Sequence, residues 1–247
     1  MTDHKVRLIV LPGWFGTASS FDDLVQLLGH IGVDAKAMDY RGYGTRRGEA
    51  GTFQMAEIAQ DALNFADRLN WQQFHVLGHS MGGMAMQRVA LNAPSRVLSM
   101  IGVTPVPASG LPLDEATRGA FAAAANDDAV RAGIIEHSVS GRLPHYWVAN
   151  LAARSRRSSD EGAFHAYGHA FINTDFALEA AELQIPLTVL VGECDPALNL
   201  PFLKSTFGQT YPQAIFELLN GAGHYPMEEV PLRLLARIEA HFVRLSA

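Results

Sequence analysis

The stretch Phe74-His75-Val76-Leu77-Gly78-His79-Ser80-Met81-Gly82-Gly83 runs from an apolar, strand-like segment straight into a Gly-x-Ser-x-Gly pattern and then into a helix-forming segment. A serine on so tight a strand-to-helix turn has a strained backbone and an exposed hydroxyl, and the glycines on either side of it let strand and helix approach closely. The pattern also arises by chance in a chain with 22 glycines, so its support must come from the rest of the sequence. We take Ser80 as the candidate nucleophile.

A serine hydroxyl is a weak nucleophile at neutral pH and needs a histidine within hydrogen-bond reach, which a carboxylate holds in the right tautomer. Asp195 follows the apolar run 187–191. His224 follows the run 214–219 and comes directly after a short loop that contains Gly221 and Gly223. Both therefore fall on loops after predicted strands, where the sites of open parallel sheets lie. The order Ser80, Asp195, His224 is also the order in which such groups follow a serine elbow.

Two carboxylates compete for the position of the orienting acid, because Glu193 and Asp195 stand on the same predicted turn. Pro196 restrains the residue before it to an extended conformation and so can fix the direction in which Asp195 points. Glu193 has a longer and more mobile side chain and is more simply interpreted as a solvated turn residue. We predict that Asp195 orients His224.

Acyl transfer also requires hydrogen-bond donors aimed at the oxyanion that develops in the transition state. The backbone amide of Met81, directly after the candidate nucleophile, stands where a helix amino terminus adds its positive dipole end. A second amide is expected from the turn Leu11-Pro12-Gly13-Trp14-Phe15-Gly16 after the first strand, with Trp14 as the donor. The alternative for this turn is a purely structural strand-to-helix connection.

Short apolar, β-branched runs alternate with amphipathic stretches along most of the chain. This rhythm predicts an α/β fold with a mostly parallel central sheet, its strands joined by helices that cover both faces. The expected strands are 6–11, 33–38, 74–77, 97–103, 187–191 and 214–219, and the expected helices are 21–31, 55–69, 84–91 and 231–245.

Between residues 105 and 185 the rhythm breaks, and the segment is rich in Ala, Arg and His with helix-like stretches but no convincing strand. An interval this long is usually functional or misassigned. We interpret it as a helical lid inserted between two parts of one core domain, residues 1–104 and 186–247; an ordinary helical surface layer is the alternative. Tyr146, Trp147 and Tyr167 are candidates for lining a substrate pocket, with packing between helices an equal alternative for each.

The composition favours a globular protein that acts on a small molecule. The chain has 247 residues, 48% hydrophobic and 18% charged, with a formal net charge of -6 that offers no field for attracting nucleic acid or an anionic membrane. No apolar run approaches the roughly 18 to 20 residues of a membrane span. The single cysteine, Cys194, excludes an intrachain disulfide, which fits a cytoplasmic location. Nothing in the composition indicates an oligomeric state.

No metal or other cofactor is expected. Glu161, His165 and His169 recur at four-residue spacing and would share one helix face, which permits a metal-binding stripe. A solvated or pocket-lining face is the simpler interpretation because no other dense set of ligands is evident. The chain also has no glycine-rich dinucleotide fingerprint.

The motifs together resemble the α/β-hydrolase superfamily, in particular its small lid-bearing serine esterases, lactonases and cofactor-free haloperoxidase-like members. The resemblance spans nearly the whole chain and rests on Pro12-Gly13-Trp14, Asp39-Tyr40-Arg41-Gly42-Tyr43-Gly44, the elbow at Ser80, Asp195-Pro196 and Gly223-His224. It implies the α/β-hydrolase fold and a serine hydrolase that cleaves a carboxylic ester, lactone or thioester of a small, largely apolar substrate through an acyl-enzyme. Many relatives have His-Gly at the oxyanion turn, whereas this chain has Pro12.

Two alternatives from other functional classes stay open. A carbon–carbon lyase of the hydroxynitrile type would use the same three residues, but such lyases have a lysine directly after the histidine, where this chain has Tyr225. A small-molecule binding protein with a vestigial hydrolase site is the other alternative, since members of one fold serve several functions.

Overall fold

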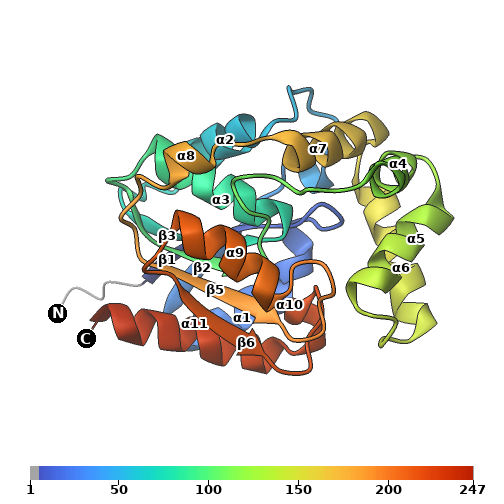
Figure 1. The fold of residues 1–247 in the computed structure, drawn as a ribbon. Helices are drawn as coiled ribbons and strands as arrows, with labels where there is room; N and C mark the ends of the chain where they lie inside the picture. Colours follow the sequence, from blue (N-terminus) through green and yellow to red (C-terminus); the bar gives the residue numbers. More distant parts are fainter. Residues whose placement is uncertain (1–5, 247) are drawn as a thin grey trace.

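The computed structural model describes residues 6–246 and places six strands in one sheet, in the order β2-β1-β3-β4-β5-β6. The strands are β1 (Val6–Leu11), β2 (Val33–Ala37), β3 (Phe74–His79), β4 (Val97–Val103), β5 (Leu187–Gly192) and β6 (Ile215–Leu219). Every neighbouring pair among them is parallel. The predicted mostly parallel sheet is therefore confirmed, and within the described residues it is wholly parallel (Figure 1).

Helices cover both faces of this sheet (Figure 1). One layer holds α1 (Asp22–His30) and α11 (Pro231–Ser246), which contact each other. The other layer holds α2 (Met55–Arg68), α3 (Met81–Asn92), α8 (Ala177–Ala180) and α9 (Leu200–Thr210), which contact one another in series. The short α10 (Pro226–Glu229) precedes α11.

The burial pattern explains why these segments form these elements. Every residue of β3 and of β5 is buried, as expected for continuous apolar strands covered on both faces. Helix α11 buries Leu234, Ile238 and Phe242, which recur at helical spacing, and turns its charged residues to solvent. The core therefore lies on both sides of the central strands, and the loops after those strands are left at one edge of the sheet.

The structure differs from the sequence interpretation at two connections. Strand β3 continues to His79 and α3 begins at Met81, so the elbow has only Ser80 between strand and helix. Helix α9 was not predicted, although it has a local start signal: the Asn199 side chain accepts a hydrogen bond from the amide of Phe202 at 3.1 Å, and a proline lies in the first turn.

Residues 105–185 form helices and contribute no strand to the sheet in the described structure. The segment contains α4 (Glu115–Ala123), α5 (Asp128–Ser138), α6 (His145–Ser158) and α7 (Glu161–Asn173), followed by α8. In Figure 1, α4, α5 and α6 stand to one side of the sheet, α7 lies next to α2 and α4, and α8 lies in the layer with α3. None of the helices in residues 6–246 has the length and apolar character needed to cross a membrane.

A buried polar network lies near the amino ends of the central strands. His75 Nδ1 lies 2.7 Å from Ser99 Oγ, which lies 2.7 Å from Nε2 of His241. The other nitrogen of His241 lies 2.8 Å from Thr188 Oγ1, which accepts a hydrogen bond from Arg244. If the hydroxyls of Ser99 and Thr188 each donate one hydrogen bond, both imidazoles can join this network in their neutral forms. Burial lowers the pKa of His75 and of His241 to about 4.

These two histidines predict a stability that falls with acidification. The unfolded chain takes up protons on histidine near pH 6.5, whereas the folded chain does so only near pH 4. The stabilising contribution is therefore complete above pH 6.5 and is lost as the pH falls toward 4, by about 1.4 kcal/mol per pH unit for each histidine. We expect His241→Gln to reduce this slope in urea unfolding measured from pH 7 to 4.5. The exposed His145→Gln should keep it, and equal slopes for all three proteins would contradict the prediction.

Candidate active site

The turn between β3 and α3 holds Ser80 in a strained conformation, with φ 53° and ψ −121°. Its amide donates to the carbonyl of Val103 at 3.1 Å, and its carbonyl accepts from the amide of Val106 at 2.9 Å. A Cβ at Gly82 would collide with the carbonyl oxygen of Leu11 at the end of β1. The strain persists because close backbone contacts on several sides fix the turn, and it leaves the serine hydroxyl accessible.

The structure brings the three sequence-predicted side chains together from loops after β3, β5 and β6. Nε2 of His224 lies 2.9 Å from Oγ of Ser80, and Nδ1 of His224 lies 2.6 Å from Oδ2 of Asp195. A carboxylate only accepts hydrogen bonds, so Nδ1 carries the proton and Nε2 is free to accept one from the serine hydroxyl. This is the arrangement in which a histidine can act as base toward a serine.

The two candidate acids occupy different positions. Asp195 is 2% exposed, and its second oxygen accepts hydrogen bonds from the amides of Ala197 and Leu198, each at 3.0 Å. Burial alone would raise the pKa of Asp195, but the charge and hydrogen bond of His224, together with these two amides, hold that pKa below its ordinary value. Glu193 instead accepts from the amide of Gly221 at 2.8 Å and joins the loops after β5 and β6.

Several residues that sequence reasoning missed hold the loop of His224. Glu229 accepts hydrogen bonds from the amides on either side of this histidine, at 2.8 and 2.9 Å. The carbonyl of His224 accepts from Nε2–H of His79 at 2.7 Å and from the Thr104 hydroxyl at 3.1 Å. Burial and the charge of His224 lower the pKa of His79 to about 3, so His79 donates as a neutral imidazole. In the sequence, the only sign of a role for Glu229 is that an acidic residue stands five positions after His224.

The two predicted oxyanion donors lie on segments that meet at Ser80. Within residues 6–246, neither the amide of Met81 nor that of Trp14 donates to a protein acceptor. The Met81 amide is one of the unpaired groups at the start of α3. A Cβ at Gly13 would lie 3.0 Å from Cβ of Ser80 and 2.7 Å from Nδ1 of His79. Glycine is therefore required for the turn before Trp14 to reach the serine.

A cavity of about 780 Å³ opens at these residues. Ser80, Asp195 and His224 line it together with Trp14, Phe15, Val106, Leu111, Pro112, Leu113, Ala116, Thr117, Ala120, Phe121, Val130, Gly133, Ile134, His137, Ser138, Phe171, Ala197, Leu198, Phe202 and Tyr225. Most of this lining is apolar, and helices α4 and α5 supply much of it. No Lys, Arg or Glu belongs to the lining within the described part of the chain, and Asp195 lies beneath the histidine.

The three residues predicted to line a substrate pocket lie outside the lining of this cavity. Tyr146 is 79% exposed on α6, a helix that contributes nothing to the lining. Trp147 donates from its indole to Glu228 at 3.1 Å and packs edge-on against Tyr225. Tyr167 is fully buried among aromatic rings, including that of Tyr40. Helical periodicity could identify faces of α6 and α7 but not which face meets the cavity.

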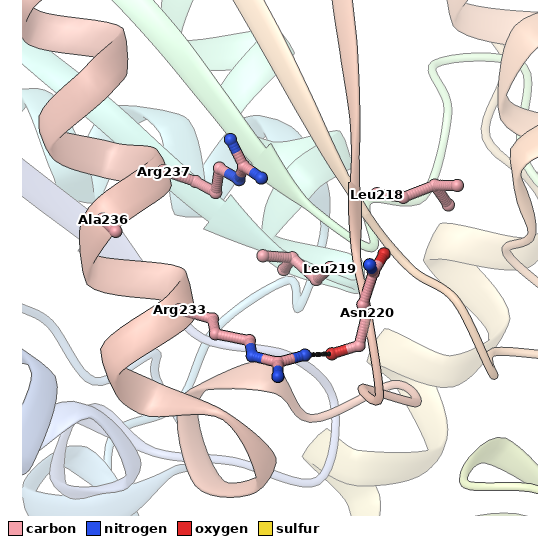
Figure 2. A pocket seen from close by; sticks show the side chains of 6 residues that line it. All are labelled: Leu218, Leu219, Asn220, Arg233, Ala236 and Arg237. Carbon is pink, nitrogen blue, oxygen red and sulfur yellow. Dashed lines mark hydrogen bonds between the residues drawn. The ribbon is translucent and has the colours of Figure 1, made fainter.

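A second hollow, of about 420 Å³, lies between β6 and α11. Figure 2 shows Arg233 and Arg237 on the helix facing the end of the strand, where Arg233 donates to the carbonyl of Asn220 at 2.6 Å. None of the predicted site residues lines this second hollow. In residues 6–246, no group of three His, Cys, Asp or Glu side chains could hold a metal ion.

Comparisons with known proteins show which family and which solved folds the chain is similar to. A family model described as alpha/beta hydrolase fold matches residues 6–231. A serine hydrolase-like protein of Dictyostelium discoideum is 28% identical over 101 residues, which are 40% of this chain and only 28% of that protein. A putative carbamate hydrolase of Stutzerimonas stutzeri is 25% identical over 234 residues, 87% of this chain and 84% of its own.

Two solved structures share the fold over nearly the whole chain. A bromoperoxidase from Bacillus anthracis superposes with a TM-score of 0.87 at 18% identity, covering 96% of this chain and 91% of its own. An esterase from Exiguobacterium antarcticum superposes with a TM-score of 0.85 at 17% identity, covering 98% of this chain and 92% of its own. At these identities the likeness concerns the fold.

The geometry predicts unequal effects of removing the two carboxylate charges near the histidine. Asp195→Asn should keep the fold but lower turnover of an activated ester by on the order of 10⁴, because the amide no longer holds the histidine tautomer. Glu193→Gln keeps an oxygen that can accept the hydrogen bond from the amide of Gly221. The turnover of this variant should therefore stay within about threefold of that of the unmodified protein. Steady-state kinetics on the two folded variants check this, and a large loss confined to Glu193→Gln would reverse the assignment.

Proposed function

The chain belongs to the alpha/beta hydrolase fold family, and we propose that within it this protein is a serine hydrolase that cleaves a carboxylic ester, lactone or thioester of a small, largely apolar substrate. The observation that carries the proposal is the hydrogen-bonded chain Asp195–His224–Ser80, which ends in an apolar cavity. The similar proteins include an esterase and a putative carbamate hydrolase, and both names agree with acyl chemistry.

In the first half of the reaction, Oγ of Ser80 attacks the substrate carbonyl carbon while Nε2 of His224 takes the serine proton. Asp195 stabilises the imidazolium that results. The carbonyl oxygen becomes an oxyanion, and the amides of Met81 and Trp14 are available to donate to it because they have no other acceptor in residues 6–246. The leaving alcohol or thiol then takes the proton from His224, and the acyl group stays on the serine.

In the second half, a water molecule replaces the leaving group. His224 takes a proton from the water as its oxygen attacks the acyl carbon, and the same two amides receive the new oxyanion. The serine–acyl bond breaks, the proton returns to Oγ of Ser80, and the carboxylic acid leaves. Each half uses the histidine once as base and once as acid, so the enzyme ends as it began.

The lining of the cavity supports a neutral substrate. Burying an unpaired charge among apolar side chains is costly, and the cavity lining in the described residues contains no Lys or Arg to pair with a carboxylate or phosphate. The walls come mainly from residues 106–138, within the expected lid segment 105–185. We therefore assign substrate selection to this segment and the chemistry to the two core parts, 1–104 and 186–247.

The reaction predicts that Ser80→Ala lowers kcat for p-nitrophenyl butyrate by on the order of 10⁴ to 10⁶, because only binding and the oxyanion donors remain. Ser205→Ala is the matched control, since that hydroxyl is exposed on α9 outside the cavity lining and donates to the carbonyl of Phe202. It should stay within about threefold of the unmodified protein. Full activity of folded Ser80→Ala would exclude the serine mechanism.

The apolar lining predicts discrimination against charge. We expect kcat/KM for p-nitrophenyl valerate to exceed that for the mono-p-nitrophenyl ester of glutaric acid by on the order of 10², because the second ester carries a carboxylate into the cavity without a partner. Alkaline hydrolysis of both esters corrects for intrinsic reactivity. Ile134→Arg should narrow the ratio by supplying a counter-charge. Equal values for the two esters in the unmodified protein would argue against a cavity selective for neutral substrates.

A further inference from the structure

The indole of Trp14 is enclosed by the helices that follow residue 105. It is 2% exposed, and its Nε1–H donates to the carbonyl of Phe164 at 2.7 Å. Its ring stacks on Phe164 with centroids 4.1 Å apart and on Phe121 with centroids 5.2 Å apart. Helices α7 and α4 therefore hold the side chain of the residue whose amide is the predicted oxyanion donor.

Helix α7 approaches the indole closely at Gly168. A Cβ at this position would lie 2.8 Å from Cζ2 of Trp14, closer than real Cβ contacts allow. Glycine weakens a helix relative to alanine, and Gly168 lies inside α7 rather than at its end. The absence of a side chain there lets the helix backbone form one wall of the indole site.

Phe164 is itself supported on the face of its ring. The guanidinium of Arg131 lies over that ring, 3.8 Å from the centroid, and Arg131 is fully buried. Its Nε–H donates to the carbonyl of Ala124 at 2.9 Å. A buried cation held by carbonyls and an aromatic face resists displacement, because movement would leave its donors without acceptors.

The backbone of the oxyanion turn is held from the other side by tyrosines. The Tyr43 hydroxyl donates to the carbonyl of Trp14 at 3.0 Å, and the Tyr40 hydroxyl donates to the carbonyl of Pro12 at 2.7 Å. The indole and the carbonyl of Trp14 are both fixed, and its amide is left without an acceptor in the described residues. The direction of the Trp14 amide is therefore set by contacts to the side chain and to the carbonyl of the same residue.

We propose that Gly168 and the carbonyl of Phe164 are positioning elements for the oxyanion donor at Trp14, so that helix α7 acts in catalysis as well as in covering the cavity. The inference rests on the proposed function, because an oxyanion forms only if Ser80 attacks a carbonyl. A donor must lie within about 2.7 to 3.1 Å of the oxyanion, so a small shift of the indole is enough to weaken it.

The test compares two glycines in the same group of helices. Gly168→Ala places a methyl group against the indole, whereas Gly119→Ala on α4 is the control, because a Cβ there meets nothing within 4 Å. With p-nitrophenyl butyrate, we expect Gly168→Ala to lower kcat by about 10- to 100-fold with KM changed less than threefold, since losing one donor entirely costs about 10² to 10³. Affinity for a boronic acid that mimics the tetrahedral intermediate should fall by the same factor. Gly119→Ala should match the unmodified protein.

A double variant separates positioning from general damage to the helix. Trp14→Phe removes Cζ2 and the indole N–H, so it should lower kcat about 10-fold by itself but also remove the clash. Adding Gly168→Ala to Trp14→Phe should then lower kcat by less than twofold further, which is a strong departure from additivity of the two substitutions. This comparison also remains informative if Gly168→Ala alone does not fold.

Each outcome has a definite meaning. A kcat within twofold of normal for folded Gly168→Ala, a loss confined to KM, or equal costs of Gly168→Ala in both backgrounds would overturn the positioning role while leaving the hydrolase intact. Failure of the unmodified protein to turn over any ester, or full activity of Ser80→Ala, would overturn the proposed function and this inference together.

Discussion

The close contact of two backbones, at the end of β1 and at the start of α3, is the constraint on which the rest of the site depends. Gly82 meets the carbonyl of Leu11 and Gly13 meets Ser80, and neither position has room for a Cβ. This contact holds the serine in a conformation that an isolated peptide would avoid. It also brings the turn of Trp14 and the first amide of α3 to the same hydroxyl, so that one arrangement fixes the proposed nucleophile and the proposed oxyanion donors.

The sequence was sufficient for the sheet and for the three central side chains, because both are encoded locally. Continuous apolar runs with helices between them predict a parallel sheet, and loops after parallel strands must meet at one edge. Ser80, Asp195 and His224 could therefore be placed together without knowledge of any long-range contact. Helix α9 was missed although Asn199 and the proline of its first turn signal its start.

The cavity could not be predicted in the same way, because its walls depend on how α4 to α7 pack on one another and on the core. Tyr146, Trp147 and Tyr167 have the chemistry of pocket residues, but packing turns them to solvent, to Glu228 and into the interior. The supports of His224 were missed for a similar reason. Glu229 lies close in sequence, but its two hydrogen bonds depend on the path of the loop, and His79 reaches the histidine carbonyl only across the elbow.

The division of the cavity walls among the helices bears on how such an enzyme can diverge. Among α4 to α7, the first two supply nine lining residues, α7 supplies only Phe171, and α6 supplies none. Helix α7 also holds the indole of Trp14 through Phe164 and Gly168. Recombination with a homologous helical segment can therefore acquire a new pocket through α4 and α5 only if it keeps Phe121, which stacks on the tryptophan, and Arg131, which lies over Phe164. A crossover that replaces α7 must likewise preserve its fit to the indole. A chimera accordingly has to inherit the turn of Trp14 and the helices α4, α5 and α7 as one matched set.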